Sequence, residues 1–210
     1  MRPISRLARS FVRLETDIWV SLARAVSRRP DTEGGTPIRY AGAESAVIWA
    51  FIVVSAVEIP AVHLLIPWPA ARFVALGLGV WGLLWMVGML AAHHMYPHVL
   101  TDELLRVRYL RRVALDLPLA GIRAVRNDLR AYDGAKSLQL TGPGETTLAV
   151  IVGSSTNIRV DLIEPQTFHT PHGDFTASTV AFWADDPKAA VASIRAAFSP
   201  DSGLASQKTD

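Results

Sequence analysis

The residues of this 210-residue chain that could carry chemistry are acidic and histidine side chains, because the sequence contains no cysteine. The chain therefore offers no disulfide, no thiolate zinc ligand and no thiol nucleophile. The most unusual candidate is Glu58, which lies inside a long apolar run, with His63 five residues later. A carboxyl group in such a run could bind a proton or an ion, or contact another helix. The alternative is a structural hydrogen bond within its own segment, since a spacing of five does not stack the two side chains on a helix.

Two groups of histidines have spacings that metal sites use. His94 and His98 are four residues apart, but a proline directly before His98 should end the helix, which favours a histidine cluster beside an apolar segment. His169, His172 and Asp174 supply three possible ligands within six residues. Proline and glycine interrupt them, so an ordinary turn between strands explains the same residues. We therefore expect no metal, no cofactor and no catalytic site, and we expect that the protein is not an enzyme.

Glu58 belongs to the first of two long apolar segments, residues 45–66 and 73–92. As helices, each would be about 30 Å long, which is the thickness of the hydrocarbon core of a bilayer. The six residues between them allow only a tight antiparallel turn. The sequence predicts a transmembrane hairpin over residues 41–98.

A glycine pattern, GLGVWG at residues 77–82, lies inside the second segment. It matches the dinucleotide-binding pattern in letters, but that pattern needs a preceding strand and a soluble βαβ unit. We instead expect Ala75, Gly79 and Gly82 to form a small-residue face that lets another helix approach closely. Such a face favours a protein partner or a homo-oligomer through the transmembrane helices.

Arginine is distributed unevenly around the hairpin. Eight arginines precede the first segment, four follow the second within 20 residues, and only Arg72 lies in the connecting loop. Positive charge remains on the cytoplasmic side of a membrane. We therefore expect a multi-pass cell-membrane protein with both termini in the cytoplasm. The basic side chains expected to face the bilayer are Arg6, Arg9, Arg13, Arg106, Arg108, Arg111 and Arg112.

The N-terminal region, residues 1–40, combines an amphipathic stretch with a linker. Apolar residues recur every three or four positions through residues 4–28, with arginines off that stripe. A basic amphipathic helix of this kind suits the membrane interface, although it could also pack on the protein's own soluble domain or on a partner. Residues 29–40 contain two prolines and two glycines among polar residues and are expected to be a linker.

The pattern changes to short alternating runs after residue 99, which predicts an antiparallel sheet, barrel or sandwich over residues 99–199. Asp186 followed by Pro187 predicts the start of a closing helix. That helix should bury Ile194 and Phe198 against the sheet. Residues 200–210 are polar and are expected to be disordered.

Three stretches in this region, VLTDELLRVRYLRRVALDLPLAGIRAVR, NIRVDLIEP and VAFWADDPKAAVASIRAAF, follow the two apolar segments. In this order they resemble the bacterial membrane proteins with a pleckstrin-homology-like (PH-like) domain. The family carries a Leu-Thr-x-(Asp/Glu)-x-Leu-x-Val first strand, a Pro-Leu-x-x-Ile step after the second strand and an Asp-Asp-Pro start to the closing helix. The resemblance covers residues 99–198 and the hairpin, and it departs at Leu110, where a glycine is common. It implies a curved, roughly seven-stranded sheet capped by one C-terminal helix, and it implies neither an enzyme nor any particular binding residue.

These features favour a membrane-anchored, non-catalytic interaction module, whose cytoplasmic PH-like domain binds a partner protein or lipid head groups. The alternative is a small ion-handling or accessory subunit of a membrane complex that uses Glu58 and His63. A net charge of only +2 does not favour binding to nucleic acid.

Overall fold

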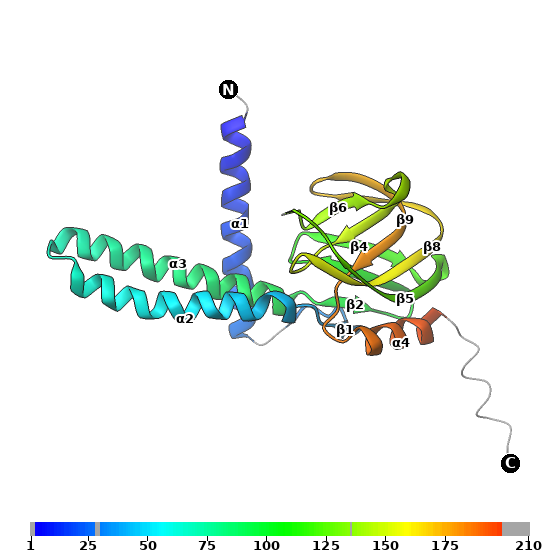
Figure 1. The fold of residues 1–210 in the computed structure, drawn as a ribbon, viewed down its shortest axis with the longest axis horizontal. Helices are drawn as coiled ribbons and strands as arrows, with labels where there is room; N and C mark the ends of the chain where they lie inside the picture. The colour runs from blue at the N-terminus through cyan, green and yellow to red at the C-terminus, as the bar shows by residue number, and fades with distance from the viewer. Residues whose placement is uncertain (1–2, 28–29, 135, 199–210) are drawn as a thin grey trace, which may run out of the picture. The chain divides into compact units, whose positions relative to one another are not determined.

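The computed structural model describes residues 3–27, 30–134 and 136–198, and it describes the side chains of the first helix from residue 15 onward. The chain forms two compact units (Figure 1). The helical unit contains the first helix and residues 44–95, and the sheet unit contains residues 31–43 and the chain from residue 96 onward. The expected disordered tail, 200–210, lies outside the described residues.

The described elements alternate little between helix and strand, as expected for an α+β protein. In chain order they are α1 (Pro3–Val26), β1 (Thr36–Ile38), α2 (Gly42–Leu65), α3 (Pro69–Met95), β2 (His98–Leu100), β3 (Leu104–Tyr109), β4 (Val113–Pro118), the 3-10 turn η1 (Leu119–Gly121), β5 (Ile122–Ala131), β6 (Leu138–Thr141), η2 (Pro143–Glu145), β7 (Thr147–Val150), β8 (Ser155–Thr170), β9 (Gly173–Phe182) and α4 (Pro187–Phe198).

The helices α2 and α3 are the two long apolar helices expected from the sequence, and both could span a membrane. Their bounds differ from the expected 45–66 and 73–92. Pro69 starts α3 inside the expected six-residue loop, because proline suits the first position of a helix. The loop is closed by Arg72, whose Nε and Nη2 donate to the carbonyl oxygen of Ile66 at 3.1 and 2.9 Å. This arginine therefore satisfies a carbonyl just beyond the end of α2.

The helix α1 packs on α3 and runs across it rather than along it (Figure 1). The closest approach is at Gly88 of α3, where an added Cβ would lie 2.4 Å from Cγ2 of Ile18. Ile18 belongs to the expected apolar stripe and is buried, whereas Val26 at the end of the same stripe is 80% exposed. The predicted amphipathic helix therefore packs on α3 through Ile18, and within its described side chains the stripe is not buried along its whole length.

The sheet unit contains two sheets. One has four strands in the order β1-β2-β3-β4, and the other has five strands in the order β5-β8-β9-β7-β6. Neighbouring strands are antiparallel except for β7 and β9, which are parallel. The prediction of an antiparallel architecture is therefore correct apart from this one pair. The described residues form nine strands, whereas the resemblance implies roughly seven.

Strand β1 lies where the sequence predicted a linker, so the interpretation of residues 29–40 is wrong for Thr36–Ile38. This strand pairs with β2, in a register that places Ile38 opposite His98. Its path is fixed by Gly35, where an added Cβ would lie 2.6 Å from the carbonyl oxygen of Leu100. Three residues carry no alternating pattern long enough to identify a strand. The segment before the hairpin is therefore part of the sheet unit.

Apolar side chains from both sheets and from α4 form one core. As predicted, α4 starts at Pro187, and Asp186 caps it by accepting the N–H of Ala189 at 3.0 Å. Ile194 is fully buried in the core, whereas Phe198 packs against the same core but is only partly buried, so the expectation for Phe198 is met in part.

The turn between β3 and β4 contains a non-glycine residue in a left-handed conformation. Leu110 occupies this turn with a φ of 53°, in the left-handed region that glycine adopts most easily. Its N–H donates to the hydroxyl oxygen of Tyr40 at 2.9 Å, and this bond holds the turn.

Candidate functional site

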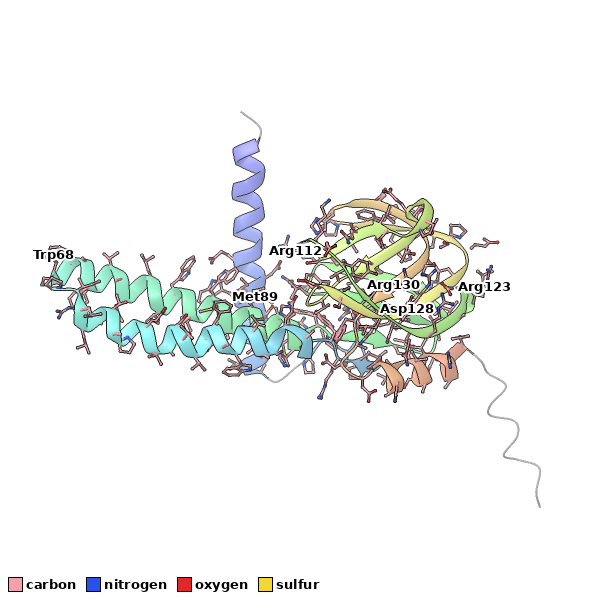
Figure 2. The ribbon with its side chains drawn as sticks, viewed as in Figure 1. Trp68, Met89, Arg112, Arg123, Asp128 and Arg130 are labelled. Atoms are coloured by element: carbon pink, nitrogen blue, oxygen red, sulfur yellow. The ribbon has the colours of Figure 1, made fainter. Side chains whose placement is uncertain are left out.

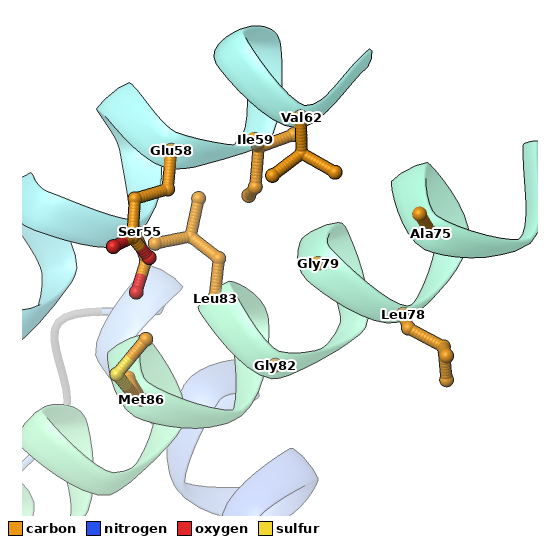
Figure 3. Close-up of a pocket in the computed structure, with 10 residues that line it drawn as sticks. All are labelled: Ser55, Glu58, Ile59, Val62, Ala75, Leu78, Gly79, Gly82, Leu83 and Met86. Carbon is orange, nitrogen blue, oxygen red and sulfur yellow. The ribbon is translucent and has the colours of Figure 1, made fainter. Parts of the chain in front are cut away.

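A groove of about 250 Å³ runs between α2 and α3 around Glu58 (Figure 3). Glu58 and Ser55 line it from α2, and Gly79 and Gly82 line it from α3. The Glu58 side chain is exposed and makes no hydrogen bond or ion pair within the described part of the chain. The complete lining is Ser55, Glu58, Ile59, Val62, Ala75, Leu78, Gly79, Gly82, Leu83 and Met86.

His63 does not line this groove. Its ring lies against Phe73 of α3 with the centroids 6.5 Å apart, and among described atoms its Nδ1 has no hydrogen-bond partner. The structure therefore does not bring Glu58 and His63 into one constellation. Their spacing of five residues turns the two side chains to different sides of the helix.

The small-residue face is used in part. An added Cβ at Gly79 would lie 2.8 Å from Cγ1 of Ile59, so this glycine permits the close approach of α2. Gly82 has no atom within 4 Å of such a Cβ, and Ala75 lines the groove. The sequence analysis missed Gly88, which permits the approach of α1. Its separation of four from Ala92 is the small-residue spacing that could have identified it.

The three histidines around the end of α3 have separate roles. His93 is buried, with Nδ1 3.0 Å from the carbonyl oxygen of Met89 and Nε2 2.8 Å from Oε2 of Glu44. His94 is exposed, with Nδ1 2.9 Å from the carbonyl oxygen of Leu90 in the preceding turn. Neither histidine contributes to a group of three or more metal-ligating side chains within the described residues.

His98 is buried in the sheet unit between two aromatic rings, Tyr40 at 4.7 Å and Phe182 at 4.9 Å. Its Nε2 donates to the carbonyl oxygen of Trp183 at 2.9 Å, and its Nδ1 accepts the N–H of Arg108 at 2.9 Å. These two bonds define a neutral imidazole. Burial lowers the pKa of His98 to about 4, opposed by the bond to Trp183 and assisted by the charge of Arg108. His98 is therefore a structural residue of the core.

The weak metal candidates His169, His172 and Asp174 lie at the turn between β8 and β9. Nδ1 of His169 is 2.8 Å from Oδ1 of Asp174, and both side chains are exposed. The backbone N–H of His172 donates to Oγ1 of Thr170 at 3.1 Å, which shapes the turn. Nowhere among the described residues do three ligating side chains come together to hold a metal. These contacts are those of a turn between two strands, which was the alternative to a metal site.

The expected membrane-facing arginines of β3 are already paired. Arg106 binds both oxygens of Asp116, with Nε–Oδ1 at 2.5 Å and Nη2–Oδ2 at 2.8 Å. Arg108 is 6% exposed, and its Nη1 donates to the carbonyl oxygen of Asp31 at 2.8 Å. The carboxylate of Glu33 bridges the two arginines, with Oε1 bound to Arg108 and Oε2 bound to Arg106.

In this cluster Arg106 and Arg108, which were expected to face the bilayer, are bound by groups of the sheet unit itself. The hydrogen bond to Asp116 is the main reason that the pKa of Arg106 is raised. The two acidic partners on the other side, Asp31 and Glu33, come from the expected linker. The sequence contains no signal that pairs residues more than 70 positions apart, so it did not predict that Asp31 and Glu33 bind these arginines.

The structure describes the side chains of some of the remaining arginines but not of those near the start of α1. Arg111 and Arg112 are exposed in the turn between β3 and β4. In β5, Arg130 pairs with Asp128 at 2.9 Å and Arg123 donates to a backbone carbonyl (Figure 2). The side chains of Arg6, Arg9 and Arg13 lie outside the part of α1 whose side chains are described.

A second groove, of about 500 Å³, lies in the sheet unit where the pairing of β8 with β9 is interrupted. Residues 162–165 have no partners on β9, because the pairing with β9 shifts between Asp161 and Gln166. Ile163 is half exposed there, beside Pro118 and Pro165. Gln166 anchors the segment by donating from Nε2 to the carbonyl oxygen of Asp116 at 2.8 Å. The groove is apolar and open, as a surface for a protein segment would be.

The chain was compared with models of protein families, with curated proteins and with solved structures, and none of the three comparisons gives a match.

Proposed function

We propose that this protein is a membrane-anchored, non-catalytic interaction module. In this proposal α2 and α3 cross the cell membrane, and the sheet unit is a PH-like domain on the cytoplasmic surface. That domain binds a partner protein or lipid head groups. The lipid bilayer is thus one partner, and no role for nucleic acid or a cofactor is proposed.

The observation that carries the proposal is the outward direction of the apolar side chains on α2 and α3. Within α2 only Ile52 is buried. Phe51 of α2 and Leu78 of α3 are 59% and 63% exposed, and the buried residues of α3 all lie toward its C-terminal end, from Gly88 onward. Water would oppose this exposure at about 25 cal/mol per Å² of apolar surface, whereas a bilayer favours it. A core helix of a soluble protein would bury these residues instead.

The orientation follows from charge and from the ends of the hairpin. Trp68, which is 72% exposed, lies at the hairpin tip (Figure 2), where tryptophan suits a membrane interface. Arginines are concentrated on the two segments that flank the hairpin. The flanks themselves are paired as β1 and β2, so the start of α2 and the end of α3 are tied together. This pairing supports two crossings with both termini in the cytoplasm.

Reporter fusions test this topology. Alkaline phosphatase, which is active only outside the cytoplasm, should be inactive when fused after residue 198 and active when inserted at Trp68. A fluorescent protein that folds in the cytoplasm should give the opposite result. Phosphatase activity at the C-terminal fusion would contradict the orientation, and loss of the protein from the membrane fraction would contradict the spans.

The PH-like assignment is supported by the sheet unit. It combines a four-stranded and a five-stranded sheet around one core, and α4 closes it after the Asp-Asp-Pro sequence. The apolar groove beside Ile163 is a surface suited to a protein segment. Purification in mild detergent should therefore recover a partner with the wild-type chain, and Ile163→Asp should reduce that recovery. Retention by the variant would exclude this groove as the contact.

The second candidate function is ion handling through Glu58, because this exposed carboxyl group has no partner among the described residues. Purified protein in liposomes loaded with a pH-sensitive dye distinguishes the two functions. The interaction module predicts the same proton leak for wild type and Glu58→Gln. A leak that only the wild type shows, with both proteins inserted equally, would favour ion handling. Glu58→Leu should weaken helix contact by about 1 kcal/mol if the carboxyl group binds a neighbouring helix.

A further inference from the structure

The cluster of Arg106, Arg108 and Glu33 has the composition of an oxyanion site. The two arginines alternate along β3 with the core residues Leu105 and Val107, so their side chains leave the same face of the strand. One carboxylate accepts a hydrogen bond from each guanidinium. Two oxygens of a phosphate group can bridge a pair of guanidinium groups in the same way.

The carboxylate that bridges the two guanidinium groups belongs to Glu33, which lies in a short turn and not in a strand of the sheet. Glu33 and Gly34 have φ values of 48° and 79°, and the N–H of Gly35 donates to the carbonyl oxygen of Thr32 at 2.8 Å. The turn holds the arginines through Glu33 and through the backbone and side chain of Asp31. We call residues 31–35 the acidic turn. Its side chains supply two negative charges, and Asp116 supplies a third, to a site whose two arginines supply two positive charges.

We infer that Arg106 and Arg108 form a phosphate-binding site and that Glu33 occupies it as an internal substitute for the phosphate. The acidic turn is then a displaceable cover of this site. When the turn leaves, both guanidinium groups regain donors for an external oxyanion, while Asp116 continues to hold Arg106 in place. The ligand is a phosphate group, carried either by an anionic phospholipid or by a soluble molecule. The phospholipid source rests on the proposed function, and the soluble source does not.

The absence of cysteine allows the cover to be observed directly. Thr32→Cys places a single spin label on the acidic turn of the full chain, reconstituted in phosphatidylcholine nanodiscs. Inorganic phosphate in the buffer, or phosphatidylglycerol in the nanodisc, should convert the label from an immobile to a mobile spectrum. Release by phosphate alone assigns a soluble ligand, and release by phosphatidylglycerol alone assigns a phospholipid.

Binding of radiolabelled inorganic phosphate to the same nanodiscs provides the second measurement. Glu33→Gln should lower the apparent Kd by about tenfold, because the apparent affinity is reduced by the fraction of molecules in which the site is closed. Glu145→Gln removes an exposed carboxylate elsewhere on the sheet unit and should leave the Kd unchanged. Adding Arg108→Gln to Glu33→Gln should abolish the binding.

Two results would overturn the inference. The first is a label that remains immobile in wild-type protein with phosphate and with phosphatidylglycerol, together with Glu33→Gln binding phosphate no better than Glu145→Gln. The cluster would then have a purely structural role, which is to hold the acidic turn on β3. Alternatively, phosphate binding that survives in the Arg108→Gln double variant would place the ligand elsewhere. The label measurement on the otherwise unchanged protein applies even if Glu33→Gln does not fold.

Discussion

Acid should destabilise the sheet unit through His98. This imidazole is fully buried, and each of its nitrogens has one fixed role: Nε2 donates to Trp183 and Nδ1 accepts from Arg108. A second proton would have to be placed on Nδ1, which faces a backbone N–H. The native state therefore resists protonation, while the unfolded chain binds the proton freely.

The size of the effect follows from the two pKa values of His98, 6.5 when unfolded and about 4 when folded. Between these values the unfolded state binds more protons than the native state, so the free energy of unfolding falls as the pH falls. The loss begins near pH 6.5 and is complete near pH 4. Each pH unit corresponds to about 1.36 kcal/mol, so the total loss is about 3 kcal/mol. This is a large fraction of the stability of a small domain.

Urea unfolding of the full chain in mild detergent, followed by the circular dichroism of the sheet, measures this loss at a series of pH values. His98→Gln should flatten the curve between pH 4 and 6.5, because glutamine can donate and accept but does not titrate. His172→Gln, at an exposed turn, should retain the slope. A slope that survives in His98→Gln would refute the assignment.

A further loss should begin only at lower pH, where Asp161 is protonated. Partial burial opposes its ionisation, but hydrogen bonds from Arg159 and Thr179 and the charges of Arg159 and Arg126 lower its pKa below 3.8. Stability from this group is present above pH 3.8 and is lost as the pH falls through the lower folded value. Asp161→Asn should remove that second step and leave the His98 step unchanged.

Three substitutions test the packing. Gly88→Ala should loosen α1 from α3, because the new methyl group would lie 2.4 Å from Cγ2 of Ile18. Proteolysis of α1 in detergent should then become faster. Gly82→Ala, whose methyl group would have no neighbour within 4 Å, should leave the rate of proteolysis unchanged. Ile194→Ala should cost about 2–5 kcal/mol in urea unfolding, since the side chain is fully buried, and a cost below 1 kcal/mol would mean that α4 is not docked. Leu110→Gly should raise stability by up to about 1 kcal/mol by relieving a left-handed backbone, and a decrease would contradict this interpretation.

The features predicted correctly from the sequence are those with local signals. Two long apolar runs identify α2 and α3, and the Asp186–Pro187 pair identifies the start of α4. Alternating residues identify β3 and β4. Each signal lies within the element it describes, so no knowledge of the fold is required.

The features that the sequence did not predict depend on contacts between distant residues. β1 is three residues long and becomes a strand only because β2 pairs with it. The parallel pairing of β7 with β9 depends on the order of strands in the sheet. Arg106 and Arg108 have the composition expected of a surface that faces anionic lipid, but acidic residues more than 70 positions earlier pair with them. A list of charges cannot show which charges are already compensated.

The placement of β1 before the hairpin and of its partner β2 after it has a consequence for biosynthesis. The ribosome makes β1 first, then residues 39–97, and only then the strand that β1 must join. The sheet unit therefore cannot be completed until the hairpin has been translated. If α2 and α3 insert in the membrane, insertion brings the two ends of the hairpin together and reduces the entropy cost of joining β1 to β2. Folding of the sheet is then timed by membrane insertion, and a chain that fails to insert leaves the edge of β2 open to other strands.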